Sequence, residues 1–318
     1  MNDAPFLLLT TSSYRYLSDG LNAGTIRVEQ FPDGERGITI CSSIKGKDVV
    51  LVGGTHSDAA TLELYDTACA IAKYGARRLT IVIPYFGYST QERAVRGIEC
   101  LVKDKSAVGL EVVTAKCRAR LISSIPAAGD GNRVILFDLH TEGLPHYFEG
   151  NIAPFHLYGK NIFLRAAKDC ANGQPFCFAS TDAGRAKWII SLSNDAGVSP
   201  AFAYKIRLSG SETQVYDCQG DVDGKVVILY DDMIRTGSSG IEAAKAYKAK
   251  GAAKIYFAAS HGVLPNNSIL KIKGCGLFSG VILTNSHPNA IKAKELAPDF
   301  VTIYDIMPEV KKLILNLP

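Results

Sequence analysis

Five apolar residues at 226–230 lead directly into the part of the sequence most able to do chemistry. Two adjacent carboxylates, Asp231 and Asp232, follow this run, and a Thr-Gly-Ser-Ser-Gly segment at 236–240 then opens a helix-like pattern. Small residues let backbone N–H groups converge on an anion, and the N-terminus of a helix adds partial positive charge. The segment could therefore bind a phosphate monoester, while the two aspartates would suit ribose hydroxyls or a Mg2+ ion. The alternative is an ordinary capped helix after a strand.

Four further polar segments could take part in binding or catalysis. An aromatic ring and two carboxylates lie together in Phe-Pro-Asp-Gly-Glu at 31–35, and a Gln-Glu-Arg segment at 91–93 follows an apolar run. His140 lies just after another apolar run, where a histidine is more often a hydrogen-bonded core residue than a ligand. Lys205 and Arg207, two residues apart on extended chain, would point to the same side and could neutralise charge on a phosphoryl group. The alternatives are a core aromatic for Phe31, a solvated turn for the two carboxylates of that segment, and a solvated strand edge for Lys205 and Arg207.

The elements that must position these residues alternate along the chain between apolar runs and helical patterns. Apolar runs without period-two alternation, separated by helices, indicate a mostly parallel sheet covered on both faces. We expect strands at 49–54, 78–83, 134–137, 175–179, 226–230, 254–259, 281–284 and 301–304. We expect helices at 60–74, 114–125, 184–194, 240–250 and 306–315. Ligands of such sheets bind at the carboxyl ends of the strands, so chemistry is to be sought in the segments that follow them.

Length and composition bound the class of protein. At roughly 150 residues per domain, the 318 residues predict two α/β domains of similar build. We place them at 1–156 and 157–299, with 300–318 as a segment that could pack back on the first. Scattered basic residues with a formal charge of only +4 argue against a nucleic-acid binder, and 47% hydrophobic residues exclude intrinsic disorder. No run approaches the roughly 18 apolar residues of a membrane span. Eight dispersed cysteines, and an N-terminal segment without the basic region of a secretory signal, indicate a reduced, cytoplasmic protein.

The segment 226–240 resembles the phosphoribosyl-diphosphate-binding loop shared by phosphoribosyltransferases and ribose-phosphate pyrophosphokinases. The other segments favour the second family. Successive landmarks of the pyrophosphokinases are matched, in chain order, by Phe31–Glu35, Ile83–Arg93, Glu111–Lys116, Phe137–Glu142, Tyr204–Arg207, Ala259–Gly262 and Thr284–Ser286. The resemblance implies two similar domains of the phosphoribosyltransferase type, each a mostly parallel sheet flanked by helices. The first domain would bind ATP and the second would bind ribose 5-phosphate.

The resemblance also implies a reaction and its residues. The diphosphate group of ATP would move to the 1-hydroxyl of ribose 5-phosphate, giving 5-phosphoribosyl 1-diphosphate and AMP, with Mg2+ as the cofactor and a dimer-based homo-oligomer, up to a hexamer, as the assembly. The implied catalytic residues are Lys205 and Arg207, and the implied metal ligands are His140 and Asp182. ATP would be bound by Phe31, Asp33, Glu35, Gln91, Glu92 and Arg93. Ribose 5-phosphate would be bound by Asp231, Asp232, Arg235, Thr236, Gly237, Ser238 and Ser239.

The sequence departs from the family pattern in four places. Arg235 stands where many relatives have an aspartate, and Thr90 stands where an arginine commonly precedes the glutamine of the ATP segment. The segment 182–184 lacks the usual second glycine after it, and the stretch 97–110 is longer than usual. Two alternative functions therefore stay open: a non-catalytic regulatory homologue that holds nucleotides, and a phosphoribosyltransferase that consumes the same diphosphate.

Overall fold

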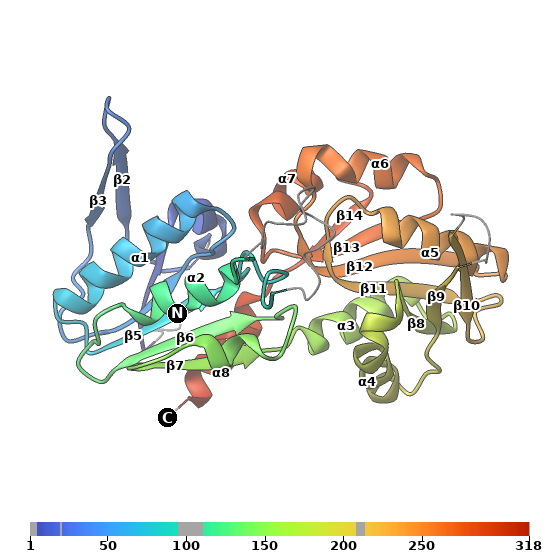
Figure 1. The fold of residues 1–318 in the computed structure, drawn as a ribbon, viewed down its shortest axis with the longest axis horizontal. Coiled ribbons are helices and arrows are strands. Elements are labelled where there is room, and N and C mark those ends of the chain that lie inside the picture. Colours follow the sequence, from blue (N-terminus) through green and yellow to red (C-terminus); the bar gives the residue numbers. More distant parts are fainter. Residues whose placement is uncertain (1–4, 20, 95–110, 208–213, 318) are drawn as a thin grey trace, which may run out of the picture. The chain divides into compact units, whose positions relative to one another are not determined.

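The computed structural model describes residues 5–19, 21–94, 111–207 and 214–317. Contacts between Cα atoms divide the chain into two compact units. The first unit comprises Met1–Leu157 and Leu313–Pro318, and the second comprises Tyr158–Lys312. Each unit contains one five-stranded parallel sheet, so the predicted fold class is confirmed (Figure 1).

The sheet of the first unit has the strand order β1-β4-β5-β6-β7, with every neighbouring pair parallel. Its strands are β1 (Leu7–Thr10), β4 (Asp48–Val52), β5 (Arg78–Ile83), β6 (Asn132–Phe137) and β7 (Ile152–Leu157). Two helices, α1 (Asp58–Lys73) and α2 (Thr114–Ser123), cover one face of this sheet. They do so through Leu64 and Ile122, which share a buried cluster with Leu51 and Ile81 of the strands. Short 3-10 helices lie at η1 (Ser12–Ser18) and η3 (Leu144–Tyr147).

An antiparallel hairpin is inserted between the first two strands of this sheet. It consists of β2 (Ile26–Gln30) and β3 (Arg36–Ile40), which pair from Ile26 opposite Ile40 to Gln30 opposite Arg36. In Figure 1 the tip of the hairpin extends away from the sheet of its own unit. The tip is the segment 31–35, so the predicted aromatic-carboxylate segment is a hairpin loop.

The sheet of the second unit has the strand order β14-β13-β12-β11-β8 and is also parallel throughout. Its strands are β8 (Phe176–Ser180), β11 (Val226–Ile234), β12 (Lys254–Gly262), β13 (Gly280–Thr284) and β14 (Val301–Tyr304). Strand β11, which lies between β12 and β8, is longer than the predicted run at 226–230, because its pairing with β12 continues to Ile234 opposite Gly262. Asp231 and Asp232 therefore lie on the end of a strand and not in a turn.

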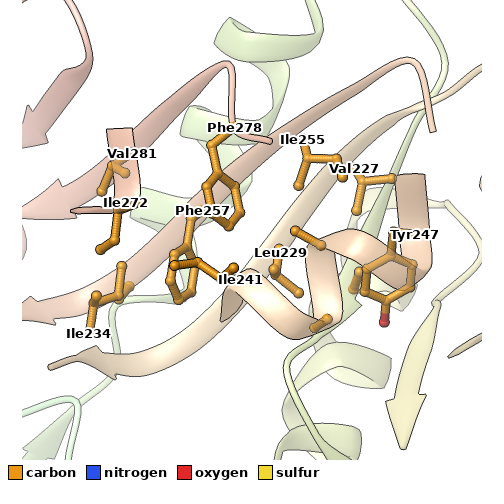
Figure 2. Close-up of a cluster of buried hydrophobic side chains, with 14 of the residues drawn as sticks. Val227, Leu229, Ile234, Ile241, Tyr247, Ile255, Phe257, Ile272, Phe278 and Val281 are labelled. Carbon is orange, nitrogen blue, oxygen red and sulfur yellow. The ribbon is translucent and has the colours of Figure 1, made fainter. Parts of the chain in front are cut away.

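Both faces of this second sheet are buried, which explains why β11 reads as a continuous apolar run. Val227 and Leu229 point to one face, where they join side chains of α5 (Ser238–Ala249), α6 (Ser268–Gly274) and α7 (Pro288–Leu296) in the cluster of Figure 2. Ile228 and Tyr230 point to the opposite face, where they pack with α3 (Lys160–Ala171) and α4 (Ala186–Ala196). Because successive side chains alternate between the two faces, helices on both sides of the sheet hold β11 in place.

The remaining elements of the second unit include a hairpin and the C-terminal strand. The hairpin β9 (Phe202–Arg207) and β10 (Gln214–Gln219) is antiparallel and follows β8 and α4 in the chain. The segment 300–318 is divided between the two units: β14 pairs with β13, contacts assign the chain up to Lys312 to the second unit, and Leu313–Pro318 belongs to the first unit. The chain ends with α8 (Met307–Asn316). Within the described ranges, none of the helices combines the length and the apolarity needed to cross a bilayer.

Candidate active site

The acid pair, Asp231 and Asp232, lies at the end of β11 beside the end of β8. The parallel register places Tyr230 opposite Ser180, so that Thr181 comes next to Asp231. Thr181 Oγ1 donates to Asp231 Oδ2 (3.0 Å), and the backbone N–H of Asp232 donates to Asp231 Oδ1 (2.9 Å). Burial, together with the neighbouring Asp232, raises the pKa of Asp231 to about 7, although Arg185 and Thr181 act in the opposite direction.

A cation from a different element contacts both members of the acid pair. Arg185 Nη2 lies 2.6 Å from Asp232 Oδ1, and Arg185 Nε lies 3.5 Å from Asp231 Oδ1. Arg185 ends the short 3-10 helix η4 (Ala183–Arg185) that precedes α4. The exposed carboxylate of Asp182 caps this turn by accepting a hydrogen bond from the N–H of Gly184 (2.8 Å). Arg185 directly follows Gly184, where the usual second glycine is missing. The residue that replaces this glycine is thus the partner of the acid pair.

The phosphate loop, residues 235–239, turns from β11 into α5. Gly237 has φ +75°, and a Cβ atom there would lie 2.5 Å from Ile272 of α6. A Cβ at Gly240, in the first turn of α5, would lie 2.3 Å from the ring of Phe257. Both positions therefore require glycine, and the start of the helix is packed directly on the core cluster. The first N–H groups of a helix have no acceptor within the helix, which leaves them available to an anion.

Hydroxyl groups and one lysine surround this helix start. Thr236 Oγ1 and Ser238 Oγ lie 3.2 Å apart, and Lys271 Nζ donates to Ser238 Oγ (3.1 Å). Lys271 belongs to α6, and its neighbour Ile272 is the residue packed against Gly237. The same contact therefore fixes the loop and brings an ammonium group to it. The side chain of Arg235 at the start of the loop is exposed.

The hairpin tip of the first unit presents an aromatic ring and two carboxylates to solvent. Phe31 is 46% exposed, and the edge of its ring lies over Gly37 of β3, where an added Cβ would be 3.1 Å away. The tip is closed by a backbone bond from Phe31 N–H to Glu35 O (2.8 Å), and Asp33 Oδ1 accepts from Glu35 N–H (3.0 Å). The exposed ring and carboxylates are thus carried on an ordered loop.

The segment 91–93 follows β5 and is fixed mainly through its backbone. Gln91 N–H donates to Tyr88 O (2.8 Å), and Tyr147 Oη donates to Glu92 O (2.5 Å). The side chains of Gln91 and Arg93 are exposed, and Arg93 Nε lies 3.6 Å from Glu92 Oε1. The predicted long stretch at 97–110 lies outside the described residues.

His140 follows β6 after a constrained piece of backbone. Asp138 is buried with φ +45°, and its N–H donates to Leu157 O (2.8 Å). The next N–H, that of Leu139, donates to Nε2 of His156 (2.9 Å). Burial lowers the pKa of His156 to about 4, so this imidazole is neutral and can accept. His140 itself is half-buried and follows directly in the chain.

The backbone of Lys205 and Arg207 is extended, as predicted. Lys205 pairs with Tyr216 and Arg207 pairs with Gln214 across the β9–β10 hairpin. The base of the hairpin is fastened by Asp217, whose carboxylate accepts from Tyr204 Oη (2.9 Å) and lies 3.1 Å from Lys250 Nζ. These contacts hold the strand that carries the two cations.

The structure therefore groups the predicted residues by unit. The acid pair and the phosphate loop meet at one end of β11, as expected from their proximity in the chain. In the first unit the predicted residues come from the hairpin tip and from the segments after the neighbouring strands β5 and β6. Sequence reasoning missed Thr181, Arg185 and Lys271. The absent glycine at 185 was a signal for one of them, whereas Lys271 belongs to none of the motifs.

Comparison with known proteins identifies the family. Residues 12–125 match the family model of the N-terminal domain of ribose phosphate pyrophosphokinase, and residues 207–314 match that of the phosphoribosyl synthetase-associated domain. The chain is 36% identical over 279 residues to ribose-phosphate pyrophosphokinase of Gloeobacter violaceus, which covers 86% of this chain and 77% of that protein. The chain belongs to the ribose-phosphate pyrophosphokinase family. The predicted family and the prediction of an enzyme are both confirmed.

Other members and a solved structure agree with this assignment. Ribose-phosphate pyrophosphokinase of Chlorobaculum tepidum is 33% identical over 262 residues, covering 82% of this chain and 75% of that protein. The crystal structure of phosphoribosylpyrophosphate synthetase from Mycobacterium smegmatis superposes with a TM-score of 0.78 at 23% identity, covering 98% of this chain and 97% of that one. The pyrophosphokinase fold therefore extends over nearly the whole chain.

Proposed function

We propose that this chain transfers the diphosphate group of ATP to the 1-hydroxyl of ribose 5-phosphate, producing 5-phosphoribosyl 1-diphosphate and AMP. The observation that carries the proposal is the juxtaposition of the acid pair with the phosphate loop at the end of β11 in a member of the ribose-phosphate pyrophosphokinase family. A sugar phosphate carries an anion and hydroxyl donors a few ångströms apart. The loop offers donors for the anion, and the aspartates offer acceptors for the hydroxyls.

Ribose 5-phosphate would be bound entirely by the second unit. Its 5-phosphate would accept from the amides at the start of α5, from the hydroxyls of the phosphate loop and from the ammonium group of Lys271. The residues of the loop are Arg235, Thr236, Gly237, Ser238 and Ser239. The ribose hydroxyls would donate to Asp231 and Asp232. Arg235 cannot accept from a hydroxyl, so we assign it to the phosphate.

ATP would be bound by residues of the first unit. The exposed ring of Phe31 is suited to stack on the adenine base, and the carboxylates of Asp33 and Glu35 could accept from its amino group. The segment Gln91-Glu92-Arg93 would contact the base and the phosphates, with Arg93 as the cation. The exposure of these side chains supports the assignment.

Mg2+ is the cofactor that we propose for the reaction, with His140 and Asp182 as protein ligands. The described part of the chain contains no group of three or more His, Cys, Asp and Glu residues arranged to hold an ion. That finding fits Mg2+, which usually keeps several waters and binds one or two protein groups together with substrate phosphates. The exposed Asp182 and the half-buried His140 offer such donors. An ion bound by either residue would neutralise part of the charge of the nucleotide phosphates.

The transfer step requires little covalent chemistry from the protein. The 1-hydroxyl oxygen would form a bond to the β-phosphorus of ATP while the bond from that phosphorus to the oxygen bridging the α- and β-phosphates breaks in line. AMP would leave with that oxygen, and the hydroxyl proton would pass to solvent. Negative charge on the transferring group has to be stabilised by fixed donors. Lys205, a point charge, and Arg207, a planar fork, are the cations that we assign to this role. We further propose a cytoplasmic, dimer-based homo-oligomer, which sedimentation analysis would test.

One assay tests the proposed function. The purified protein is incubated with ATP, Mg2+ and ribose 5-phosphate, and phosphorus NMR follows AMP and the new diphosphate ester, with ribose 5-phosphate omitted as the control. Both products should appear together and only with the sugar phosphate present. Arg235 and Thr90 are the features that favour a regulatory homologue, which would bind nucleotide without turnover. A phosphoribosyltransferase would leave ATP intact and consume the diphosphate ester.

A further inference from the structure

A cation of the protein itself, the side chain of Arg185, already contacts both members of the acid pair. The guanidinium group of Arg185 contacts one oxygen of each carboxylate, at 2.6 Å from Asp232 Oδ1 and 3.5 Å from Asp231 Oδ1. Its side chain is 19% exposed, and that of Asp232 is 6% exposed. Ion pairs as buried as this one are screened far less than surface pairs.

The contacts of Arg185 compete with a divalent ion for the oxygens of the two carboxylates. Asp231 Oδ1 already receives the N–H of Asp232 as well as Arg185, and Asp231 Oδ2 receives Thr181 Oγ1. When both aspartates are ionised, the two carboxylates and the guanidinium carry a formal charge of −1 and not −2, which weakens the attraction for Mg2+. A divalent ion beside the guanidinium would also meet like-charge repulsion.

The backbone fixes the approach of Arg185 before any ligand binds. Arg185 lies at the junction of η4 and α4, and the turn is capped by Asp182. The strand ends of β8 and β11 are neighbours, so the side chain has to span only the gap between two adjacent strands. The planar guanidinium is suited to hold two carboxylates in a set orientation. The two carboxylates therefore keep a fixed orientation.

We propose that Arg185 is a built-in counter-ion of the acid pair, which orients Asp231 and Asp232 to accept ribose hydroxyls without a divalent ion at this end of the site. The inference rests on the proposed function, because it takes ribose 5-phosphate as the ligand. Arg185 is a positioning residue: it acts through the two aspartates. Binding of the sugar phosphate is then independent of Mg2+, whereas the metal serves the nucleotide.

Calorimetric titration of the nucleotide-free protein with ribose 5-phosphate, in EDTA and in excess Mg2+, tests this inference. The Kd of the wild-type protein should differ by less than about 3-fold between the two buffers. Arg185→Met should bind about 10-fold more weakly in EDTA, since truncating one partner of a buried charge pair is costly, and should regain part of the loss in Mg2+. Arg185→Lys restores the charge but not the planar fork, and its affinity in EDTA should lie between those of Arg185→Met and wild type.

Three results would overturn the inference. The first is wild-type binding that requires Mg2+, and the second is equal, metal-independent binding by wild type and Arg185→Met. The third is a manganese anomalous peak on Asp231 or Asp232 in wild-type crystals soaked with Mn2+ and ribose 5-phosphate, a test that holds even when Arg185→Met does not fold. A protein that binds no ribose 5-phosphate in either buffer but forms AMP and the diphosphate ester overturns the inference alone, whereas a protein that forms neither product contradicts the proposed function.

Discussion

The ends of the two parallel sheets differ in how far their binding groups are assembled. In the second unit, side chains from separate elements bond to one another: Arg185 to the acid pair, and Lys271 to Ser238. In the first unit, the predicted nucleotide residues are held largely through backbone bonds, as at Phe31 and Gln91, and their side chains are exposed except that of Glu92, which is half-buried. The binding groups of the second unit are held by contacts between side chains, whereas those of the first unit are held by the backbone of their loops.

This difference has an energetic consequence. Groups that are already fixed lose little conformational freedom when a ligand binds, whereas exposed side chains lose rotamer entropy at that moment. The second unit should therefore bind ribose 5-phosphate with a nearly preformed site. The first unit should order its side chains around the nucleotide. Substitutions at the preformed end should alter both folding and binding, and those at the exposed end should alter binding alone.

The largest effect is expected from the two cations of the β9–β10 hairpin. Lys205→Ala and Arg207→Ala should each lower kcat by about 100-fold, because each removes a donor to the charge that develops during transfer. The KM for ribose 5-phosphate should stay near that of wild type, which steady-state kinetics would show. Lys254→Ala removes an exposed cation at the start of β12 in the same unit and serves as the control. Normal turnover in both alanine variants would remove these residues from the mechanism.

The next largest effect is expected where the phosphate loop is most tightly packed. Gly237→Ala forces a side chain into φ +75° and to within 2.5 Å of Ile272, so the loop has to shift. We expect a loss of about 1–3 kcal/mol in the free energy of unfolding and a Kd for ribose 5-phosphate raised about 20-fold. Gly274→Ala, in the same unit and with nothing within 4 Å of an added Cβ, is the matched control. Denaturation and calorimetry would measure both quantities, and a stable variant with unchanged affinity would contradict the preformed loop.

Much of the fold could be predicted because buried parallel strands read as apolar runs. The expected strands at 78–83, 281–284 and 301–304 coincide with β5, β13 and β14. Strand β7 was missed, because Pro154 interrupts its pattern, which an edge strand tolerates. The β2–β3 hairpin was missed because its strands are partly exposed and lack an apolar run.

The site could be predicted only where its residues are contiguous in the chain. The acid pair and the phosphate loop lie within one short segment after a strand, so strand-end reasoning found them together. The contacts of Arg185 with Asp232 and of Lys271 with Ser238 join segments far apart in the sequence. Such contacts depend on which strands and helices become neighbours, and the register of β8 beside β11 is not encoded in any local pattern.

A smaller effect is expected from the lysine that only the structure places at the loop. Lys271→Met should raise the KM for ribose 5-phosphate about 10-fold, because it removes a charge-assisted donor from the phosphate site. The KM for ATP should remain near that of wild type. Lys273→Met removes the same charge two residues along the helix and controls for general electrostatics. Equal effects of the two substitutions would show a diffuse contribution of charge and no specific contact.

The exposed end of the first unit should give a still smaller and purely ligand-directed effect. Phe31→Ala should raise the KM for ATP about 5-fold through the loss of base stacking, and leave that for ribose 5-phosphate unchanged. The melting temperature should barely change, since Phe31 is 46% exposed. Tyr74→Ala, another exposed aromatic of this unit at 63%, is the control. A marked loss of stability in Phe31→Ala would mean that the side chain of the hairpin tip contributes to folding, as the side chains of the acid pair do.

The smallest effect that separates the two ends is the pH dependence of folding. Because burial and Asp232 raise the pKa of Asp231 to about 7, the folded chain keeps a proton that the unfolded chain loses near its ordinary value of about 4. The contribution of this group to stability is complete below that ordinary value and disappears as the pH rises through about 7. Wild type should therefore lose more of its free energy of unfolding than Asp231→Asn between about pH 5 and about pH 8.

Urea denaturation at the two pH values measures this difference, with Asp33→Asn at the exposed hairpin tip as the control that should follow wild type. The comparison turns on Arg185. If its guanidinium outweighed burial and the charge of Asp232, Asp231 would already be ionised at the lower pH, and wild type and Asp231→Asn would then respond equally to pH. An equal response would mean that Asp231 is ionised at both pH values. The carboxylates of the acid pair could then accept hydroxyls over the whole range of pH between them. A steeper response of wild type would show that a bound sugar phosphate has to stabilise the ionised form.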